Sequence, residues 1–288
     1  MVRWKLMLFC ASPLLAQLAL PPEPQATRFA VIGDMGNGRA EQYQVAGEMA
    51  ERHKEFPFDF VLMVGDNILG RHNRADYQKK FETPYRPMLE GGVRFYAALG
   101  NHDDAGELLY KPFNMEGKRY YSFRKGTAEF FALDSTHMDA RQLSWLATQL
   151  RNSAAVWKIC YFHHPLYSEG KFHGPSTALR GALEPVLDKY GVQVVFSGHE
   201  HVYERIKPHN GVNYFIVGNS GQLRAHGLRP SQDTAKGFDT DRTFLLGEIA
   251  GNHFYFQAIS RTGETVDRGM LTTGDATDAG KTASSAGH

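Results

Sequence analysis

Short apolar runs recur along the chain, and each one ends abruptly at polar residues. The runs occupy 28–32, 58–64, 93–99, 157–162 and 192–196, and they lead into Gly33-Asp34, Gly65-Asp66, Gly100-Asn101-His102-Asp103, His163-His164-Pro165 and Gly198-His199-Glu200-His201. Continuous apolar runs of this length, bounded by glycine, are typical of strands that are buried on both faces. The pattern therefore predicts a set of buried strands that each lead into chemically active side chains.

Helical periodicity separates several of these runs and predicts three helices. One spans 39–55, and a second begins at a capping box formed by Asp139 and Gln142. A third is expected after Ser176, and Pro185 within it predicts a kink or a restart. The apolar faces of the three helices are Ala46, Met49, Ala50 and His53; Leu143, Leu146, Ala147 and Leu150; and Leu179, Leu183, Val186, Leu187 and Tyr190.

Five further segments have the character of strands, several of them antiparallel: 119–124, 129–134, 212–217, 243–249 and 254–259. Strand–helix alternation followed by a strand-rich end indicates an α/β sandwich with mixed β-sheets. Residues 27–271 contain no linker, internal repeat or shift in composition, so we expect one domain over that range.

The two ends of the chain differ from the middle. Residues 1–20 combine Arg3 and Lys5 with an apolar stretch and small residues, which predicts a signal peptide and a secreted or periplasmic protein; a disordered tail is the alternative. That stretch is too short and too interrupted to be a good membrane span. Residues 272–288 contain no long apolar side chain, and we expect a disordered tail.

Composition narrows the class of protein. Of the 288 residues 42% are hydrophobic and 22% charged, as in an ordinary soluble globular protein. Lys plus Arg number 32 and Asp plus Glu 31, so the net charge is +1 and nothing favours nucleic-acid binding. The two cysteines, Cys10 and Cys160, exclude a disulfide framework, and Cys160 is expected to be a small buried apolar residue.

The polar residues that follow the strands form a candidate metal site. Functional groups gather at the carboxyl ends of strands in open α/β sheets, which would bring together Asp34, Asp66, Asn101 with His102, His163 with His164, and His199 with His201. Each cluster alone has an ordinary explanation as a turn or a helix cap, but five in succession do not. Carboxylate, amide and imidazole ligands without a thiolate suit Mn, Fe or Zn.

In this order the motifs resemble those of the calcineurin-like metallophosphoesterases, over residues 28–260. Within that family the chain is most similar to the small purple acid phosphatase branch, which the segment His173-Gly174-Pro175 also resembles. The resemblance implies a four-layer α-β-β-α sandwich and two metal ions about 3.5 Å apart. It also implies the ligands: Asp34, Asp66 and His201 for one ion, and Asp66, Asn101, His163 and His199 for the other. Asp66 would bridge the ions, and the family register favours His163 over His164.

One position departs from the pattern of the purple acid phosphatases. Members of that branch have a tyrosine ligand three residues after the bridging aspartate, where this chain has Leu69, and Gly36 replaces a histidine usual in the wider family. The missing phenolate removes the charge-transfer colour and leaves one ion a ligand short. A water or Asn37 could fill the gap, although Asn37 before Gly38 is better explained as a turn residue. The departure places a ferric ion and an acid pH optimum in doubt.

A reaction mechanism follows from two bound metal ions. They would lower the pKa of a bound water, so that a metal-bound hydroxide attacks the phosphorus atom. A positioned histidine would assist the leaving group, and His102 and His173 are the candidates. Asp103 either orients His102 or caps a turn. The turn Gly218-Asn219-Ser220-Gly221 is a weaker candidate for lining the pocket.

The predicted function is hydrolysis of phosphate monoesters with two divalent or trivalent ions, Fe, Mn or Zn. A phosphodiesterase on the same scaffold is the nearest alternative, because loops such as 71–92, 104–118 and 222–242 would set the substrate pocket. A non-catalytic metal-binding protein is a less favoured alternative. A protein Ser/Thr phosphatase is disfavoured, because Gly65-Asp66 is followed by Asn-Ile-Leu-Gly. The sequence leaves the physiological substrate and the oligomeric state open.

Overall fold

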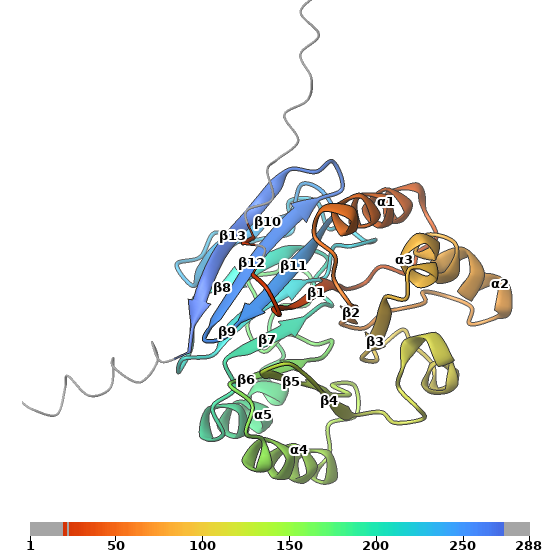
Figure 1. The fold of residues 1–288 in the computed structure, drawn as a ribbon. Coiled ribbons are helices and arrows are strands. Elements are labelled where there is room, and N and C mark those ends of the chain that lie inside the picture. Colours follow the sequence, from red (N-terminus) through yellow and green to blue (C-terminus); the bar gives the residue numbers. More distant parts are fainter. Residues whose placement is uncertain (1–19, 22, 274–288) are drawn as a thin grey trace, which may run out of the picture.

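The computed structural model describes residues 20–21 and 23–273, which form the coloured ribbon of Figure 1. The predicted signal peptide lies outside the described residues except for Leu20, which is buried. The predicted C-terminal tail also lies outside them from residue 274 onward, while Thr272 is the last residue of a strand.

The first of two mixed β-sheets has six strands. Their order is β13 (Thr265–Thr272), β12 (His253–Ser260), β11 (Thr243–Ala250), β1 (Thr27–Ile32), β2 (Phe60–Met63) and β3 (Arg94–Ala97). Strands β1, β2 and β3 are parallel, whereas β11 to β13 form an antiparallel meander attached to β1. The three parallel strands are those that the sequence predicts to end in Asp34, Asp66 and Asn101.

The second sheet has seven strands. Their order is β10 (Thr234–Phe238), β8 (Tyr203–Ile206), β9 (Asn213–Val217), β7 (Val194–Ser197), β6 (Trp157–Tyr161), β5 (Ala128–Ala132) and β4 (Tyr121–Lys125). Strands β5, β6, β7 and β9 are parallel, and the remaining three pair antiparallel at the two edges. The parallel strands β6 and β7 lead into His163 and His199.

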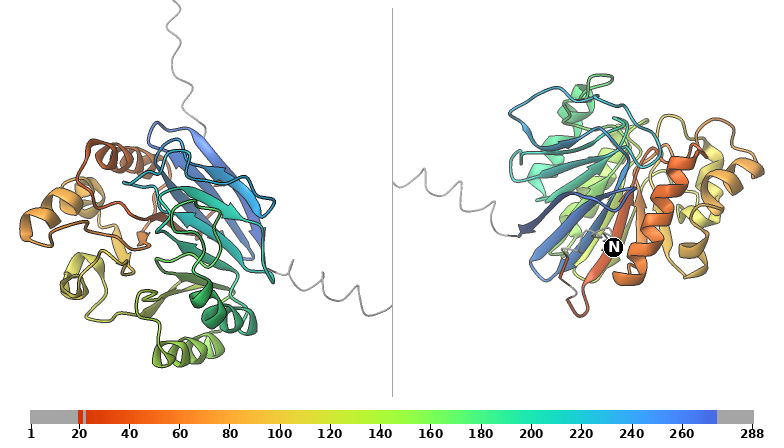
Figure 2. Two further views of the ribbon diagram at one scale, coloured as in Figure 1. Left: turned by 180° about the vertical axis from the view of Figure 1, so that it is seen from behind. Right: turned by 90° about the horizontal axis from the view of Figure 1, so that it is seen from above.

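Helices cover the outer faces of the two sheets, and Figure 2 shows the resulting four layers, α-β-β-α. Beside the first sheet lie α1 (Ala40–Glu55), α2 (Arg74–Tyr77) and α3 (Arg86–Glu90), with a short π-helix at Gln78–Glu82. Beside the second sheet lie α4 (Ala140–Asn152) and α5 (Thr177–Lys189), and two 3-10 turns at Ala105–Leu109 and Lys111–Phe113 follow β3. The predicted sandwich is confirmed.

The sheets pack through a layer of aromatic rings. Phe29 on β1 stacks between Phe60 and Phe254 of its own sheet, with ring centroids 5.5 and 5.8 Å away. Its edge meets Phe130 and Phe196 of the second sheet at 5.3 and 6.1 Å. Buried rings gain both from loss of water contact and from edge-to-face geometry. This layer fixes the distance between the two sheets.

The central strands of the second sheet are buried on both faces, as their continuous apolar runs predict. Trp157, Ile159 and Tyr161 of β6 face the first sheet, while Cys160 and Phe162 pack in the cluster beneath α4 and α5. Successive side chains of a strand point to opposite faces, so a strand with two buried faces needs no polar alternation. Cys160 is buried, as expected.

Helix boundaries follow local chemistry. Asp139 caps α4, because its carboxylate accepts from the Gln142 backbone N–H at 2.7 Å. The reciprocal half of the predicted capping box is replaced, since the Gln142 side chain bonds the backbone of Asp134 instead. The restart predicted at Pro185 is wrong, because α5 continues through it. The carbonyl that the proline ring crowds belongs to Gly181, whose backbone adjusts more freely than that of other residues.

Candidate functional site

The carboxyl ends of the parallel strands of both sheets meet at one edge of the sandwich, which we call the rim. Asp34, Asp66 and Asn101 reach it from the first sheet, following β1, β2 and β3. His163 and His199 reach it from the second sheet, following β6 and β7, and His201 follows two residues after His199. The hydrogen bonds and close polar contacts that follow join these six side chains directly, so the structure brings all six together.

Three of these residues have an unusual backbone conformation. Asp34, Asp66 and His199 have positive φ angles of 52°, 54° and 70°, in the left-handed region that residues other than glycine seldom adopt. Such conformations cost free energy and persist where the surroundings impose them, often at functional sites. Each residue lies where the chain leaves a strand, and the turn directs its side chain along the rim.

Two glycines allow the loops to approach one another closely. A Cβ atom on Gly100 would overlap Asp66 Oδ1, and one on Gly198 would overlap Asp34 Oδ2. Any larger residue at either position would push the carboxylate away from the rim. The glycines before Asn101 and His199 are therefore explained by packing against the neighbouring polar clusters.

Asp34, Asp66 and His201 form the first group that could hold a metal ion. One ligand atom from each lies within 4.8 Å of the others, and His201 Nε2 is 3.3 Å from Asp34 Oδ1. Asp34 Oδ2 accepts from the His199 backbone N–H at 2.9 Å. Asp34 Oδ1 is buried and has no hydrogen-bond partner among the described residues. A buried oxygen without a partner is costly, and a cation would satisfy it.

His163 lies at the centre of a second group. Its Nε2 is 3.0 Å from Asn101 Oδ1, 3.1 Å from His199 Nδ1 and 3.4 Å from Asp66 Oδ1. Its Nδ1 lies 3.1 Å from the Val64 carbonyl oxygen, which leaves Nε2 facing the other donors. Ligands about 2.1 Å from one metal ion and at right angles are about 3 Å apart. The three distances from His163 Nε2 therefore match the spacing between ligands of one metal ion.

Burial controls the protonation of the site. It raises the pKa of Asp34 well above the usual value, and the neighbouring Asp66 carboxylate raises it further. Burial and the surrounding histidines lower the pKa of His163 well below its usual value and that of His199 to about 2. Burial and the nearby Arg224 lower the pKa of His201 to about 4. Neutral imidazoles beside carboxylates are suitable ligands for a cation, so the donor set fits a pair of metal ions.

Three further histidines, His102, His164 and His173, lie around this centre. His102 and His173 are exposed, and the His173 ring centroid is 4.2 Å from that of His199. The His102 backbone N–H donates to Asp66 Oδ1 at 3.0 Å. The His164 ring centroid is 4.4 Å from that of His199, and its Nδ1 lies 3.0 Å from Ser135 Oγ. Asp34, Asp66 and His163 thus form the buried floor of the site, while Asn101, His102 and His173 are on its solvent side.

The structure resolves two of the alternatives that the sequence leaves open. Asn37 is a turn residue, because its side chain accepts from the Arg39 backbone N–H and donates to the Gly221 carbonyl oxygen. Asp103 clamps turns and makes no hydrogen bond to His102; its carboxylate accepts from the backbone N–H groups of Asn67, Ile68 and Gly100 and from the Asn67 side chain.

The turn 218–221 supports the Asp34 loop from behind. Ser220 Oγ accepts from the Gly33 backbone N–H at 3.2 Å, and the Gln222 N–H donates to the Asp34 carbonyl oxygen at 3.0 Å. A Cβ atom on Gly218 would lie 3.0 Å from Asp34 Oδ2. The turn holds the Asp34 loop in place.

Sequence reasoning missed a buried polar network behind the Asp66 loop. Glu107 is fully buried and accepts from the Asn67 side chain at 3.1 Å, and His72 Nε2 lies 3.3 Å from its other oxygen. His72, Asp103 and Glu107 form a second cluster of metal-binding residue types. Asp103 is already saturated by four donors, so this cluster functions as a clamp on Asn67. No local pattern distinguishes Glu107 from an exposed acid in a loop.

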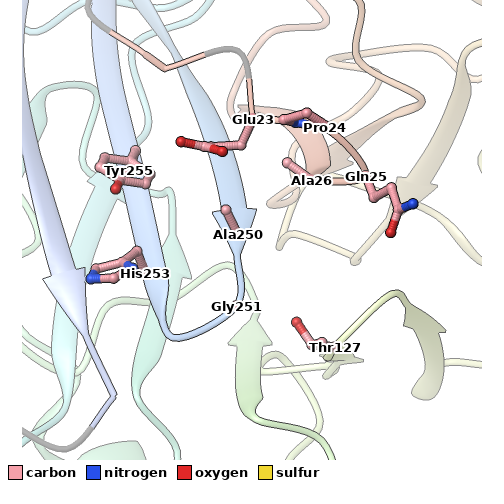
Figure 3. A pocket seen from close by; sticks show the side chains of 9 residues that line it. All are labelled: Glu23, Pro24, Gln25, Ala26, Thr127, Ala250, Gly251, His253 and Tyr255. Atoms are coloured by element: carbon pink, nitrogen blue, oxygen red, sulfur yellow. The ribbon is translucent and has the colours of Figure 1, made fainter.

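A separate cleft lies at the opposite end of β1 from Asp34 (Figure 3). It has a volume of about 560 Å³ and is lined by residues 23–26, Thr127, Ala250, Gly251, His253 and Tyr255. It contains neither of the two clusters of metal-binding residue types found in the described part of the chain. Within the described residues, no helix has both the length and the apolar character that crossing a bilayer requires.

Comparison with protein families gives one match over most of the folded region. The sequence model described as calcineurin-like phosphoesterase matches residues 27–203. This range contains all six residues of the rim.

Curated proteins with similar sequences are acid phosphatases. Tartrate-resistant acid phosphatase type 5 of Rattus norvegicus is 27% identical, and the match covers 82% of this chain and 85% of the relative. Purple acid phosphatase 4 of Arabidopsis thaliana is 30% identical and covers 75% of each chain.

Solved structures share the fold at lower identity. Purple acid phosphatase PPD1 from yellow lupin (Lupinus luteus) seeds matches with a TM-score of 0.74 at 18% identity, over 87% of this chain and 55% of that chain. A structure described as GAP50, the anchor in the inner membrane complex of Plasmodium, matches with a TM-score of 0.74 at 20% identity. The match covers 86% of this chain and 89% of that chain. These two likenesses concern the fold alone.

Proposed function

The chain belongs to the calcineurin-like phosphoesterase family and is a phosphoric ester hydrolase, and we propose that it hydrolyses phosphate monoesters with two metal ions bound at the rim. The observation that carries the proposal is the convergence of six oxygen and nitrogen ligands from loops of both sheets. The curated relatives named above are phosphatases, which favours monoesters over diesters as substrates.

We assign Asp34, Asp66 and His201 to one ion, and Asp66, Asn101, His163 and His199 to the other. Asp66 is the shared ligand, because it belongs to the first group and one of its oxygens also lies 3.4 Å from His163 Nε2. When bound, the two ions supply activation of a water nucleophile and neutralisation of charge on the phosphoryl oxygens. The residues themselves hold that centre rigidly, because strand ends and tight turns fix all six.

His102 and His173 are the proposed proton donors to the leaving group. Both are exposed next to buried ligands, so they can reach an ester oxygen of a phosphate seated at the rim. As the bond between phosphorus and the leaving oxygen breaks, a histidine donates its proton to that oxygen and the alcohol departs. General acid catalysis of this kind contributes about 10²- to 10⁴-fold to the rate.

Fe, Mn and Zn are the metals that the donor set suits. Leu69 supplies no ligand atom, and its backbone N–H bonds the Gly36 carbonyl oxygen at 2.9 Å beside the Asp34 loop. The ion held by Asp34 and His201 therefore has no phenolate, and we expect iron-loaded protein to lack a phenolate charge-transfer band in the visible region. Metal analysis of protein purified without added metals should find two ions per chain.

The experiment that tests the proposed function compares 4-nitrophenyl phosphate with bis(4-nitrophenyl) phosphate in the presence of Fe, Mn or Zn. Faster turnover of the monoester supports the proposal, and faster turnover of the diester supports the phosphodiesterase alternative. Asp66→Asn should lower kcat at least about 100-fold, because even residues that only support ligands contribute about 10- to 100-fold. His102→Ala should retain both metals and lose about 100-fold or more. A wild-type protein that binds metal without turnover would instead be a non-catalytic metal-binding protein.

We also infer that the protein is exported, to the periplasm or the medium. The inference is supported by Arg3, Lys5 and the apolar stretch that follows them in residues 1–20. The mass of the protein recovered from an export-competent bacterial host tests it. Cleavage near residue 20 supports export, and an intact N-terminus on cytoplasmic protein contradicts it.

A further inference from the structure

Glu200 lies between two ligands but its side chain points away from them. It is fully buried, and its Oε1 accepts from the backbone N–H groups of His173 and Gly174 at 2.6 and 2.5 Å. Bonds from backbone amides to a carboxylate are about twice as strong as bonds between neutral groups. One carboxylate therefore ties the strand end that carries His199 and His201 to the loop that carries His173.

The loop 170–174 closes tightly around this carboxylate. A Cβ atom on Gly170 would overlap the Glu200 carboxylate, and Gly174 has a φ of +71°, which favours glycine. The first half of the loop has other anchors, since Arg229 donates to the carbonyl oxygens of Gly170 and Lys171. Glu200 is the anchor that the structure shows for the amides of residues 173 and 174.

This anchor sets the position of His173. The His173 side chain is exposed, and its ring packs on His199 with centroids 4.2 Å apart. A shift of about 1 Å in a group that must meet the reacting atoms can cost about 100-fold in rate. Holding the backbone of residue 173 is therefore the direct way to hold its imidazole over the site.

We propose that Glu200 is a positioning residue, which fixes His173 so that its imidazole protonates the leaving oxygen of the substrate. The proposal rests on the proposed function. In the step concerned, a bond forms between water oxygen and phosphorus while the bond from phosphorus to the leaving oxygen breaks. The proton moves from the His173 imidazolium to the leaving oxygen, so an alcohol departs and the imidazole becomes neutral. Glu200 touches no reacting atom and acts only through the loop.

The dependence of kcat on the leaving group tests the proposal, because a purely structural role would affect both substrates equally. Phenyl phosphate and 4-nitrophenyl phosphate have similar shapes, but phenolate is the poorer leaving group and depends more on a proton donor. Glu200→Gln keeps the shape of the side chain and removes the charge that strengthens both hydrogen bonds. We expect kcat for phenyl phosphate to fall about 10- to 100-fold, and kcat for 4-nitrophenyl phosphate to fall by a small factor, with the metal content unchanged.

Glu204→Gln is the matched control. Glu204 is also fully buried and also binds the segment between β6 and α5. Its carboxylate accepts from the Glu169 backbone N–H at 3.0 Å and from Ser168 Oγ at 2.9 Å. It does not contact residues 173 or 174, so its replacement should leave the ratio of the two kcat values at the wild-type level. A changed ratio in Glu204→Gln would show that any buried carboxylate there affects the leaving group, and would overturn the proposal.

A double-mutant cycle completes the test. In a His173→Ala background, Glu200→Gln should have no further effect on phenyl phosphate, because the group that it positions is absent. Glu200→Asp keeps the buried charge but withdraws the oxygen, and should give the same substrate-dependent loss if Glu200→Gln does not fold. Equal losses on both substrates, loss of metal from Glu200→Gln, or additive effects in the cycle would each overturn the proposal. Absence of hydrolysis by the wild type would instead contradict the proposed function.

Discussion

Individual side chains at the rim differ sharply in their contact with water. Asp34, Asp66 and His163 are almost completely buried, whereas His102 and His173 are exposed a few ångströms away. Buried donors interact strongly with a cation because little water screens the charge. Exposed histidines can instead exchange protons with solvent after each turnover. Burial thus separates Asp34, Asp66 and His163 from the two histidines proposed for proton transfer.

Glu107 offers a test of the clamp behind Asn67. Burial raises the pKa of Glu107 from 4.5 to about 8, so the folded protein keeps a proton that the unfolded chain loses. Between these values the unfolded state binds fewer protons, and the free energy of unfolding falls as the pH rises. Glu107→Gln has no proton to lose. The difference in melting temperature between Glu107→Gln and the wild type should therefore shift in favour of Glu107→Gln as the pH rises from about 5 to about 8. This shift should correspond to at least about 1 kcal/mol in the free energy of unfolding.

Thermal melts of both proteins at the same metal concentration measure this difference. Gln keeps an oxygen that can accept from the Asn67 side chain, so the comparison removes the titratable group and keeps the hydrogen bond. Parallel melting profiles across the pH range would show that Glu107 is already ionised in the folded protein.

Residue patterns in the sequence predicted the candidate ligands but not their supports. Asp34, Asp66 and His199 could be found because each follows an apolar strand and a glycine. Glu107 and Glu200 could not, because a buried acid and an exposed acid have the same letter, and their partners lie 26 or more residues away along the chain. Burial of a charged residue becomes visible only when the loops are placed in space.

Short elements position the site, and glycine at their ends sets how closely they approach. Gly100→Ala would place a Cβ against Asp66 Oδ1 and the Asp66 backbone nitrogen, neither of which has room to move. We expect it to lower metal content and kcat at least about 10-fold and to destabilise the fold by about 1–3 kcal/mol. Metal analysis and thermal melts test this.

Gly47→Ala is the control for that substitution. Gly47 is exposed in the middle of α1, and nothing lies within 4 Å of the position its Cβ would take. Alanine there should stabilise the protein by about 0.5–1 kcal/mol and leave kcat unchanged. If Gly100→Ala also left kcat unchanged and did not destabilise the protein, the close approach of Gly100 to Asp66 would not matter for function.

At the level of elements, strands with continuous apolar runs were predictable, and three strands interrupted by polar residues were not. The parallel strands β1, β2, β6 and β7 have continuous apolar runs because both their faces are covered. Strands β8, β10 and β13 were missed. The run of β8 contains the buried Glu204 bonded to Ser168, and β10 and β13 lie at sheet edges with exposed polar residues. Hydrophobic periodicity fails where a strand has several exposed polar positions or a satisfied buried charge.

Across the whole molecule, the site joins the two halves of the sandwich. Asp34, Asp66 and Asn101 follow strands of the first sheet, while His163 and His199 follow strands of the second. Polar contacts between the halves, such as His163 Nε2 to Asn101 Oδ1 at 3.0 Å, cross from one sheet to the other. Ions bound there would add direct links between the loops of the two sheets to these polar contacts and to the aromatic core. The site should therefore contribute to global stability as well as to activity.

Metal removal tests this coupling. A ligand present at about 100 times its dissociation constant stabilises a folded protein by about 2.7 kcal/mol, and in a chain of this size 1 kcal/mol shifts the melting temperature by about 2–4 °C. Chelation should thus lower the melting temperature by about 5 °C or more, and adding back the metal should restore it. Asp66→Asn, which lacks the shared carboxylate, should show a much smaller metal-dependent shift. Gly47→Ala should show the full shift from a higher baseline. An unchanged melting temperature after chelation, in protein shown to have lost its metal, would mean that the ions do not contribute to holding the sheets together.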